Sequence, residues 1–132
     1  MRPPIVQQVT FLYTADLQET AVFYESILEL PLVLDQGNCR IYGTGNGAFL
    51  GFCQHLAAND PASGVILTLV SEDVDTWYAY LKEKGVTFEQ PPKQNETFNI
   101  YRCLFHDPNG YTIEIQKFLD PVWPKAWRGH DI

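Results

Sequence analysis

Two stretches of the chain change their hydrophobic period in the same way, from strand-like alternation to helical spacing. In QVTFLYTADLQETAVFYESILEL the change comes at Asp16, and in GVILTLVSEDVDTWYAYLKEKGV it comes at Asp73. An acidic residue at this point is typical of a helix N-cap, and Glu19 follows Asp16 at capping-box spacing. Each stretch therefore predicts a strand followed by a helix. The predicted apolar stripes comprise Leu17, Ala21, Tyr24 and Leu28 in the first helix and Val74, Trp77, Tyr78 and Leu81 in the second.

Short apolar runs separated by turn residues follow each predicted helix. The segment LPLVLDQGNCRIYGTGNGAFLGFCQ predicts an antiparallel meander, and the second half offers VTFEQ, a Pro-rich loop PPKQNETF, NIYRCLF and YTIEIQKF. The halves match at an offset of 57 residues, which aligns Asp73 with Asp16 and Ile66 with Val9. We therefore expect an α+β fold of two tandem β-α-β-β-β modules, residues 5–55 and 63–119, in a single domain of residues 1–132 with an irregular tail at 120–132.

One helix covers only one face of each predicted sheet, so two such modules are expected to form a curved mixed sheet that bears a cleft. Strand alternation assigns a largely aromatic lining to this cleft. The alternative is that these aromatic side chains fill a closed core, and Gly51 favours the pocket because it removes a side chain at the centre. The predicted lining comprises Phe11, Tyr13, Tyr42, Phe49, Ile66, Thr68, Val70, Tyr101, Phe105, Thr112 and Glu114, together with Arg40.

Composition narrows the classes of partner. The 132 residues carry sixteen acidic and nine basic side chains, for a formal net charge of −7. This balance disfavours nucleic acid and anionic membrane surfaces, and it favours a small-molecule ligand that is neutral or cationic and partly aromatic. The sequence has neither an apolar run of membrane-spanning length nor a signal-peptide pattern, so we expect a cytoplasmic protein.

Three cysteines at wide spacings indicate neither a disulfide framework nor a zinc site of the CxxC kind. We therefore expect Cys39, Cys53 and Cys103 to be buried thiols. Cys103 shares the expected cleft face with Tyr101 and Phe105, so it can be considered as a nucleophile in the cleft. A packing role is favoured, because the sequence places no histidine beside it as a base.

Glu114 is the acid that the cleft prediction leaves to be explained. In DPNGYTIEIQ a tight turn leads into a strand, and alternation places Glu114 on one face with Thr112. A carboxylate on a sheet face can be a metal ligand, a general base, an ion-pair partner or a solvated charge. The sequence by itself leaves these four roles open.

Residues 7–118 resemble the vicinal oxygen chelate superfamily, which includes glyoxalase I, bleomycin-resistance proteins and extradiol dioxygenases. The resemblance lies in TADLQETAVFYESILEL, similar to the strand-to-helix signature of that superfamily, and in FHDPNGYTIEI, similar to its closing signature. It implies that metal ligands, where present, come from the first and last strands of each module. The matching positions here are Val9, Gly51, Ile66 and Glu114. A single donor cannot hold a catalytic metal, so neither a metal nor another cofactor is expected.

Three hypotheses for function follow. The leading one is metal-independent binding of a small molecule by a homodimer, similar to the bleomycin-resistance branch, with Glu114 orienting the ligand or neutralised by Arg40. The second is an enzyme of the same superfamily, a lyase, isomerase or dioxygenase, with a non-standard metal site or with Glu114 as general base. The third is a structural or regulatory partner whose cleft is vestigial.

Overall fold

The computed structural model describes residues 1–55 and 64–124, and the chain divides into two compact units. Unit 1 comprises Met1–Ile66 together with His106–Thr112. Unit 2 comprises Leu67–Phe105 and Ile113–Ile132. The segment His106–Thr112 is thus separated in sequence from the rest of unit 1 but belongs to it.

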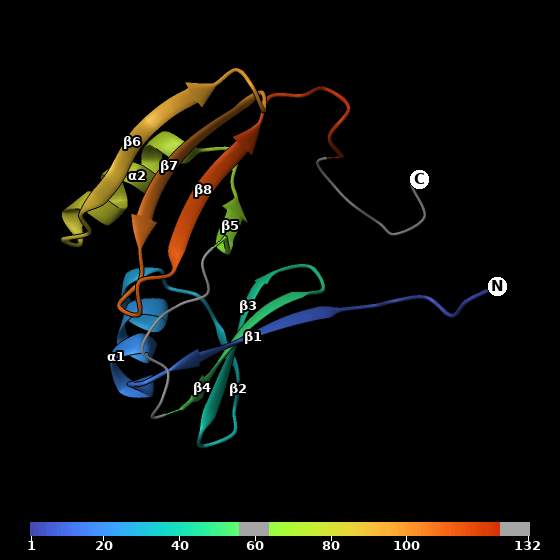
Figure 1. Ribbon diagram of the computed structural model, residues 1–132, viewed down its shortest axis with the longest axis vertical. Coiled ribbons are helices and arrows are strands. Elements are labelled where there is room, and N and C mark those ends of the chain that lie inside the picture. The colour runs from blue at the N-terminus through green and yellow to red at the C-terminus, as the bar shows by residue number, and fades with distance from the viewer. Residues whose placement is uncertain (56–63, 125–132) are drawn as a thin grey trace. The chain divides into compact units, whose positions relative to one another are not determined.

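Unit 1 contains one helix and a four-stranded mixed sheet (Figure 1). The strand order is β1-β4-β3-β2, in which β1 runs parallel to β4 and the other neighbours are antiparallel. The predicted strand, helix and meander are therefore confirmed. The elements are β1 (Gln8–Thr14), α1 (Leu17–Ala21), which continues as the π-helix η1 (Val22–Ile27), β2 (Leu32–Asp35), β3 (Cys39–Gly45) and β4 (Ala48–Gln54).

Unit 2 repeats this plan, with strand order β5-β8-β7-β6 and with α2 against one face of the sheet (Figure 1). The prediction of a Pro-rich loop after a short strand is wrong, because β6 continues through Pro91 and Pro92 with shifts of register. An edge strand accepts proline because one side of its backbone needs no partner. The α+β class with two tandem modules is confirmed. The elements are β5 (Ile66–Val70), α2 (Val74–Glu83), β6 (Phe88–Asn95), β7 (Ile100–His106) and β8 (Thr112–Phe118).

Both helices begin where the sequence predicts. Asp16 Oδ1 accepts a hydrogen bond from the Glu19 amide at 3.0 Å, and Asp73 Oδ1 accepts one from the Thr76 amide at 3.0 Å. These bonds satisfy amide groups that lack partners within the first helical turn. The predicted stripe of the first helix is buried throughout, whereas in α2 the residues Val74 and Leu81 are fully buried.

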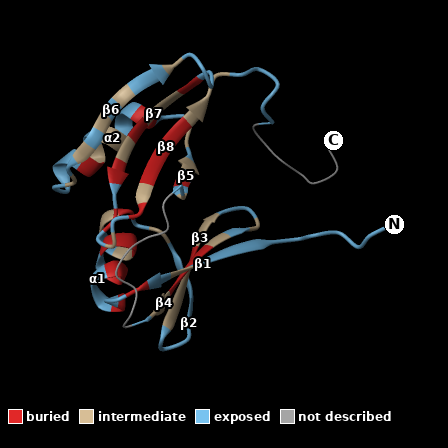
Figure 2. Ribbon diagram, viewed as in Figure 1, coloured by how far each residue is buried: buried red, intermediate tan, exposed pale blue. Residues whose placement is uncertain are grey.

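Tyr24 lies at the centre of the core of unit 1, on the face of the sheet that the helix covers. Its ring packs on Phe52, with centroids 4.4 Å apart, and stacks near Tyr42 at 5.9 Å. All three residues are fully buried. Figure 2 shows the corresponding buried stretches on the helix of unit 1 and on β7 and β8 of unit 2.

The Asp107 carboxylate anchors the β7–β8 segment in unit 1. Its Oδ2 accepts a hydrogen bond from the Tyr24 hydroxyl at 2.9 Å, and its Oδ1 accepts from the amides of Asn109 and Tyr111 at 2.9 and 2.8 Å. Asp107 is 5% exposed, and burial raises its pKa despite these donors. A buried carboxylate needs such donors, and here they also fix the turn and attach it to the helix.

Asn109 extends this network to the first strand. Its amide nitrogen donates to Thr20 Oγ1 at 3.0 Å, and its oxygen accepts from the Thr14 hydroxyl at 2.7 Å. The hydroxyls of Thr14 and Thr20 lie 2.8 Å apart, and both side chains are fully buried. The DPNGY sequence between β7 and β8 is therefore hydrogen-bonded to both β1 and α1.

Cys39 and Cys53 form a disulfide between β3 and β4, so the prediction that both are buried thiols is wrong. The two residues are direct cross-strand partners, with Cα atoms 4.1 Å apart. The flanking bond from the Gln54 amide to the Asn38 carbonyl identifies a non-hydrogen-bonded pair, in which side chains approach most closely. Chain spacing could not reveal this partnership, because strand register determines it. The free cysteine, Cys103, is buried as predicted.

We predict that Asp107→Ala lowers the free energy of unfolding by about 3–5 kcal/mol, because it leaves the Tyr24 hydroxyl and two backbone amides without their acceptor. Tyr24→Phe removes one donor and leaves the others bonded, so it should cost about 1 kcal/mol. Urea denaturation of the two variants measures both values. Equal effects would show that the carboxylate does not organise the segment.

The disulfide closes a loop with a sequence separation of 14 residues. Replacing both cysteines, Cys39→Ala with Cys53→Ala, should lower the free energy of unfolding by about 3 kcal/mol under oxidising conditions. Reductant should destabilise the wild-type protein and leave this double variant unchanged, as denaturation with and without dithiothreitol will show. Dependence on reductant that persists in the double variant would contradict the assignment.

Candidate functional site

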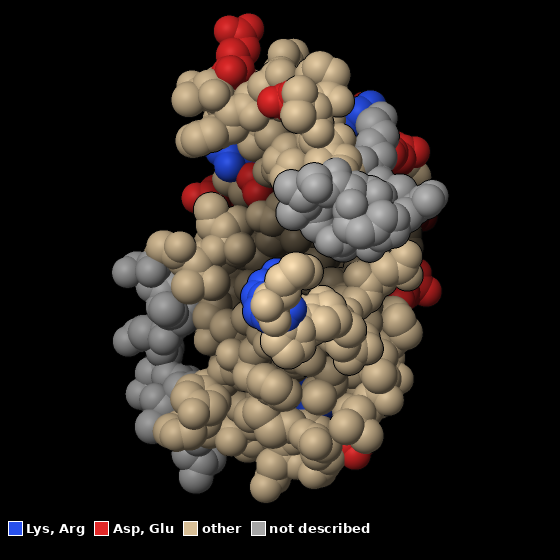
Figure 3. Space-filling view, turned by 90° about the vertical axis from the view of Figure 1, so that its right-hand side faces the viewer, with Lys and Arg blue, Asp and Glu red and all other residues tan. Residues whose placement is uncertain are grey.

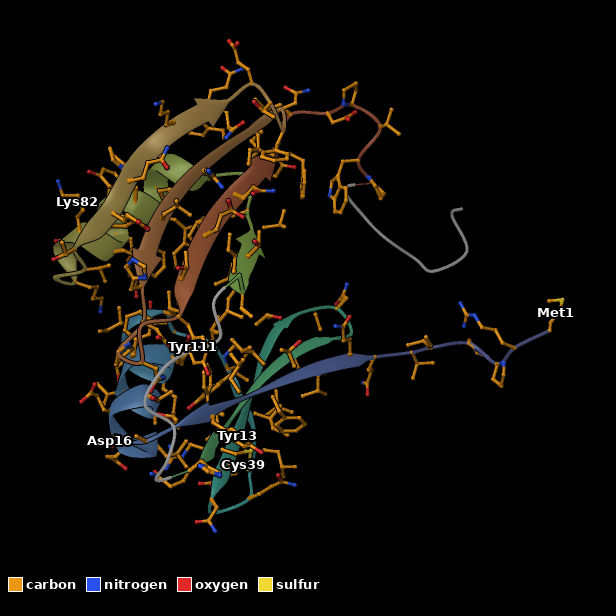
Figure 4. All side chains as sticks on the ribbon, in the orientation of Figure 1. Met1, Tyr13, Asp16, Cys39, Lys82 and Tyr111 are labelled. Atoms are coloured by element: carbon orange, nitrogen blue, oxygen red, sulfur yellow. A yellow bond between two sulfur atoms is a disulfide. The ribbon has the colours of Figure 1, made fainter. Side chains whose placement is uncertain are left out.

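Unit 1 presents aromatic side chains on the face of its sheet that lies away from α1, which we call its helix-free face. The strand register places Phe11, Gly51 and Ile41 side by side, with Tyr13 and Phe49 on the same face. Phe11 and Tyr13 are 53% and 60% exposed. Figure 4 labels Tyr13 and Cys39 on this sheet, where Cys53 of β4 lies between them in the strand register. The predicted roles of Phe11, Tyr13 and Phe49 as lining residues are consistent with these positions and remain proposals.

The absence of a side chain at Gly51 makes room for the Phe11 ring. A Cβ atom at position 51 would lie 2.6 Å from Phe11 Cδ1 and 3.5 Å from Ile41 Cγ1. The space over the centre of this sheet is therefore occupied by an aromatic ring from the neighbouring strand. Gly51 leaves the space on this face, and the Phe11 ring fills that space with an apolar aromatic surface.

Tyr42 and Arg40 do not belong to this face, which corrects the predicted lining. Tyr42 is fully buried against the helix, and its hydroxyl donates to Glu25 Oε2 at 2.7 Å. Burial is the main cause of a raised Tyr42 pKa. Arg40 also bonds Glu25 at 2.7 Å and lies 3.7 Å from Asp35. Arg40 and Tyr42 flank Ile41 in β3, so their side chains lie on the opposite face from Ile41 and point toward η1.

The helix-free face of unit 2 carries a polar group, the Glu114 cluster, which consists of Thr68, Arg102, Glu114 and Gln116. Glu114 Oε1 accepts from the Thr68 hydroxyl at 2.7 Å, and Oε2 accepts from Arg102 Nη1 at 2.7 Å. With its amide nitrogen turned toward the carboxylate, Gln116 donates to both oxygens, at 2.7 and 3.0 Å. The Glu114 side chain is 6% exposed and that of Arg102 is 20% exposed.

The cation that pairs with Glu114 is therefore Arg102, and the prediction that Arg40 neutralises it is wrong. Sequence reasoning missed Arg102 because it assigned the opposite parity of β7 to the cleft. The sequence does contain a signal for Arg102, because it is a charged residue in a mostly apolar strand, between Tyr101 and Cys103. A lone cation inside an apolar strand needs a carboxylate nearby.

Tyr101, Cys103 and Phe105 lie on the face that α2 covers, so their predicted place in the lining is also corrected. Phe105 and Cys103 are fully buried, and the Tyr101 hydroxyl donates to Asp75 of α2 at 2.5 Å. Burial raises the pKa of the Cys103 thiol to about 11, which disfavours the nucleophilic thiolate. Cys103 is thus a packing residue.

The remaining predicted residues lie on β5 and β8. Ile66 and Val70 share the strand parity of Thr68 along β5, and they are 50% and 57% exposed. Thr112 shares the strand parity of Glu114, and its hydroxyl lies 3.5 Å from His106 Nδ1. Ile66 and Val70 therefore share the face of Thr68 on β5, and Thr112 shares the face of Glu114 on β8.

The two modules can be compared position by position, to see whether the sheet needs polar residues where the Glu114 cluster lies. The offset of 57 residues that aligns the modules sets Thr68 on Phe11, and the NG turns set Glu114 on Gly51. Ile41 is the register partner of Gly51, and Arg102 is bonded to Glu114. We therefore treat Ile41 as the counterpart of Arg102. One module therefore folds with an apolar trio where the other has a polar trio.

The residues at the four positions that the superfamily uses for metal ligands do not form a metal site here. Val9, Gly51 and Ile66 offer no side-chain donor, and the oxygens of Glu114 are already bonded to Arg102, Thr68 and Gln116. Within residues 1–55 and 64–124, no three His, Cys, Asp or Glu side chains gather closely enough to hold a metal ion. The Glu114 cluster is suited to hydrogen bonding and charge pairing.

The distribution of basic side chains bears on the kind of partner. On the face that Figure 3 shows, the Lys and Arg side chains drawn in colour lie apart from one another. Among the described residues, there is no helix with the length and apolar character needed to cross a bilayer.

We predict that Glu114→Gln lowers the free energy of unfolding by about 2–4 kcal/mol, because it leaves the Arg102 charge without its partner. Replacing both residues by leucine should cost less than this single change, since paired apolar side chains substitute well for a buried ion pair. Urea denaturation measures the two variants. A double variant less stable than Glu114→Gln would mean that the ion pair is required to hold the sheet.

Comparisons with known proteins agree with this architecture. The family model of the Glyoxalase/Bleomycin resistance protein/Dioxygenase superfamily matches residues 5–115. A Bacillus subtilis (strain 168) relative, the uncharacterised protein YraH, is 27% identical, with 79% of this chain and 91% of that protein covered.

Solved structures show the same fold. A glyoxalase/bleomycin resistance protein/dioxygenase from Nocardioides has a TM-score of 0.70 at 23% identity, covering 97% of this chain and 92% of that chain. Lactoylglutathione lyase from Agrobacterium tumefaciens has a TM-score of 0.69 at 19% identity, covering 87% of this chain and 95% of that chain. The family match and the shared fold together show that this chain belongs to the glyoxalase/bleomycin resistance protein/dioxygenase superfamily.

Proposed function

We propose that this protein binds a small organic molecule on the helix-free faces of its sheets, without a catalytic metal. The observation that carries the proposal is the state of Glu114, the one donor among the four positions that the resemblance assigns to metal ligands. Thr68, Arg102 and Gln116 already occupy its oxygens. A metal would have to displace a close guanidinium and would then find a single protein ligand.

The aromatic face of unit 1 supplies the apolar part of the binding energy in this proposal. Phe11 and Tyr13 are more than half exposed. Covering an exposed aromatic ring with a ligand contributes about 1.5–3 kcal/mol through burial, and stacking adds to it. This favours a ligand that is partly aromatic. The formal charge of −7 agrees with one that is neutral or cationic.

The alternative in which Glu114 acts as a general base receives less support from the contacts. A base must have a lone pair free to take a proton from the substrate. Glu114 is held by a cation at 2.7 Å, and its oxygens also accept from Thr68 and Gln116. A positioning role within the ligand-binding face is therefore the role that we assign to Glu114.

A homodimer in the cytoplasm completes the proposal. Leu32, Val33 and Leu34 of the edge strand β2 are 40–55% exposed, which offers apolar surface to a second copy. The Cys39–Cys53 disulfide is of a kind that persists in oxidising compartments. A cytoplasmic location therefore requires that the two thiols be reduced in the cell, which alkylation of freshly lysed cells can measure.

The binding proposal predicts that acetophenone, a neutral aromatic probe, binds equally well before and after treatment with EDTA. Phe11→Ala should weaken this binding by about 10-fold, which corresponds to about 1.4 kcal/mol of lost aromatic contact. Isothermal titration calorimetry of the wild-type protein and the variant measures both effects, and elemental analysis should find far less than one metal ion per chain.

Phe98→Ala is the matched control, because Phe98 is 69% exposed and lies in the turn between β6 and β7. It should leave the affinity unchanged. About one metal ion per chain, together with binding that EDTA abolishes, would favour the enzyme instead. Equal losses for Phe11→Ala and Phe98→Ala would show that the probe adheres to exposed rings in general.

A further inference from the structure

Arg102 uses only part of its hydrogen-bonding capacity within the protein. Its Nη1 atom donates to Glu114 at 2.7 Å. Its Nε atom is buried and has no hydrogen-bond partner among the residues that the structure describes. A buried N–H without an acceptor costs about 1–3 kcal/mol, so an unpaired one in a native fold calls for an explanation.

The geometry of a guanidinium group suggests what the missing partner is. Its five N–H donors lie in one plane, and Nε–H forms one edge of that plane together with a terminal N–H. Such an edge matches an oxygen acceptor. Glu114 bonds Arg102 through Nη1 and so leaves Nε–H unpaired. The Arg102 side chain is 20% exposed, but Nε itself is buried, so a ligand oxygen must displace the side-chain atoms that cover Nε before it can accept from Nε–H.

Comparison of the modules indicates that this arrangement does not serve folding. Unit 1 builds the equivalent place from Phe11, Gly51 and Ile41, without a charged side chain. Replacing a buried ion pair by apolar side chains is often neutral or stabilising. Unit 2 therefore retains an ion pair with an unpaired donor where its own duplicate folds without one.

Charge selects among oxygen-bearing ligands. Arg102 and Glu114 neutralise each other, and Thr68 and Gln116 hold the carboxylate in place. A cationic group would have to displace Arg102 from Glu114. A carboxylate would add unbalanced negative charge to a chain that already carries −7. A neutral carbonyl oxygen meets neither obstacle.

We infer that Arg102 recognises the ligand, that its Nε–H donates to a neutral carbonyl oxygen of a ketone, amide or lactone, and that Glu114 is the positioning residue that holds the guanidinium in place. This inference rests on the proposed small-molecule binding and specifies the class of ligand. It assigns to Arg102 the recognition role that the sequence suggests for Glu114.

Nitrogen-15 NMR tests the inference directly, because the Nε–H group of each arginine gives its own signal. Three probes with the same ring are titrated into the wild-type protein: acetophenone, benzoate and benzylammonium. Acetophenone should shift the Arg102 Nε–H signal and bind at least threefold more tightly than either charged probe. The Arg40 Nε–H signal should remain in place, because Arg40 is bonded to Glu25.

Two variants separate recognition from general electrostatics. Arg102→Lys keeps the charge beside Glu114 but removes the planar fork, so it should weaken acetophenone binding at least fivefold while the melting temperature barely moves. Lys93 lies opposite Arg102 in the register of β6 and β7, and Lys93→Met removes a positive charge next to the cluster. That control should leave acetophenone binding unchanged.

The possible failures differ from one another. Shifts around Phe11 with an unmoved Arg102 Nε–H signal would overturn the inference and leave the proposed binding function intact. Tighter binding of benzylammonium would assign recognition to Glu114, and tighter binding of benzoate would overturn the neutral class. If none of the three probes perturbs any signal, the proposed binding of small aromatic molecules fails as well.

Discussion

The buried carboxylate of Asp107 is the constraint on which the organisation of unit 1 depends. It lies in a segment that follows β7, yet its hydrogen bonds go to Tyr24 in the helical segment of unit 1 and to the turn at Asn109 and Tyr111. A carboxylate that is 5% exposed cannot remain there without those donors. The segment that leads into β8 is thus held within unit 1 by hydrogen bonds to its own turn and to the helical segment.

Duplication followed by divergence explains how one fold carries two different surfaces. Both modules build a four-stranded sheet with one face covered by a helix, and the covered faces hold the buried aromatic residues. The other faces have diverged. In unit 1, Phe11 fills the space over Gly51, whereas in unit 2 Glu114 is held by Arg102, Thr68 and Gln116. The apolar version satisfies the sheet, and the proposed ligand binding gives a reason for the polar version.

The pairing of Glu114 with Arg102 also changes the chemistry that the superfamily fold can support here. A carboxylate that points into an apolar site must find a cation, and in this chain a neighbouring strand provides one. The pair cancels the charge that would attract a metal or a cationic ligand, and it leaves the buried Nε–H of Arg102 without an acceptor among the described residues. Recognition of a neutral oxygen is therefore the chemistry most consistent with the contacts.

Local patterns were enough to predict the two modules, the helix N-caps at Asp16 and Asp73 and the parity of Phe11, Thr68 and Glu114, because each depends on periodicity within one element. The tertiary structure decided the pairings between elements. The parity of β3 and β7 turned Tyr42, Tyr101 and Phe105 toward the helices, and strand register joined Cys39 to Cys53. The partner of Glu114 is Arg102 and not Arg40 for the same reason. A shift of one residue in strand register exchanges the two faces of a sheet, and only contacts between strands fix that register.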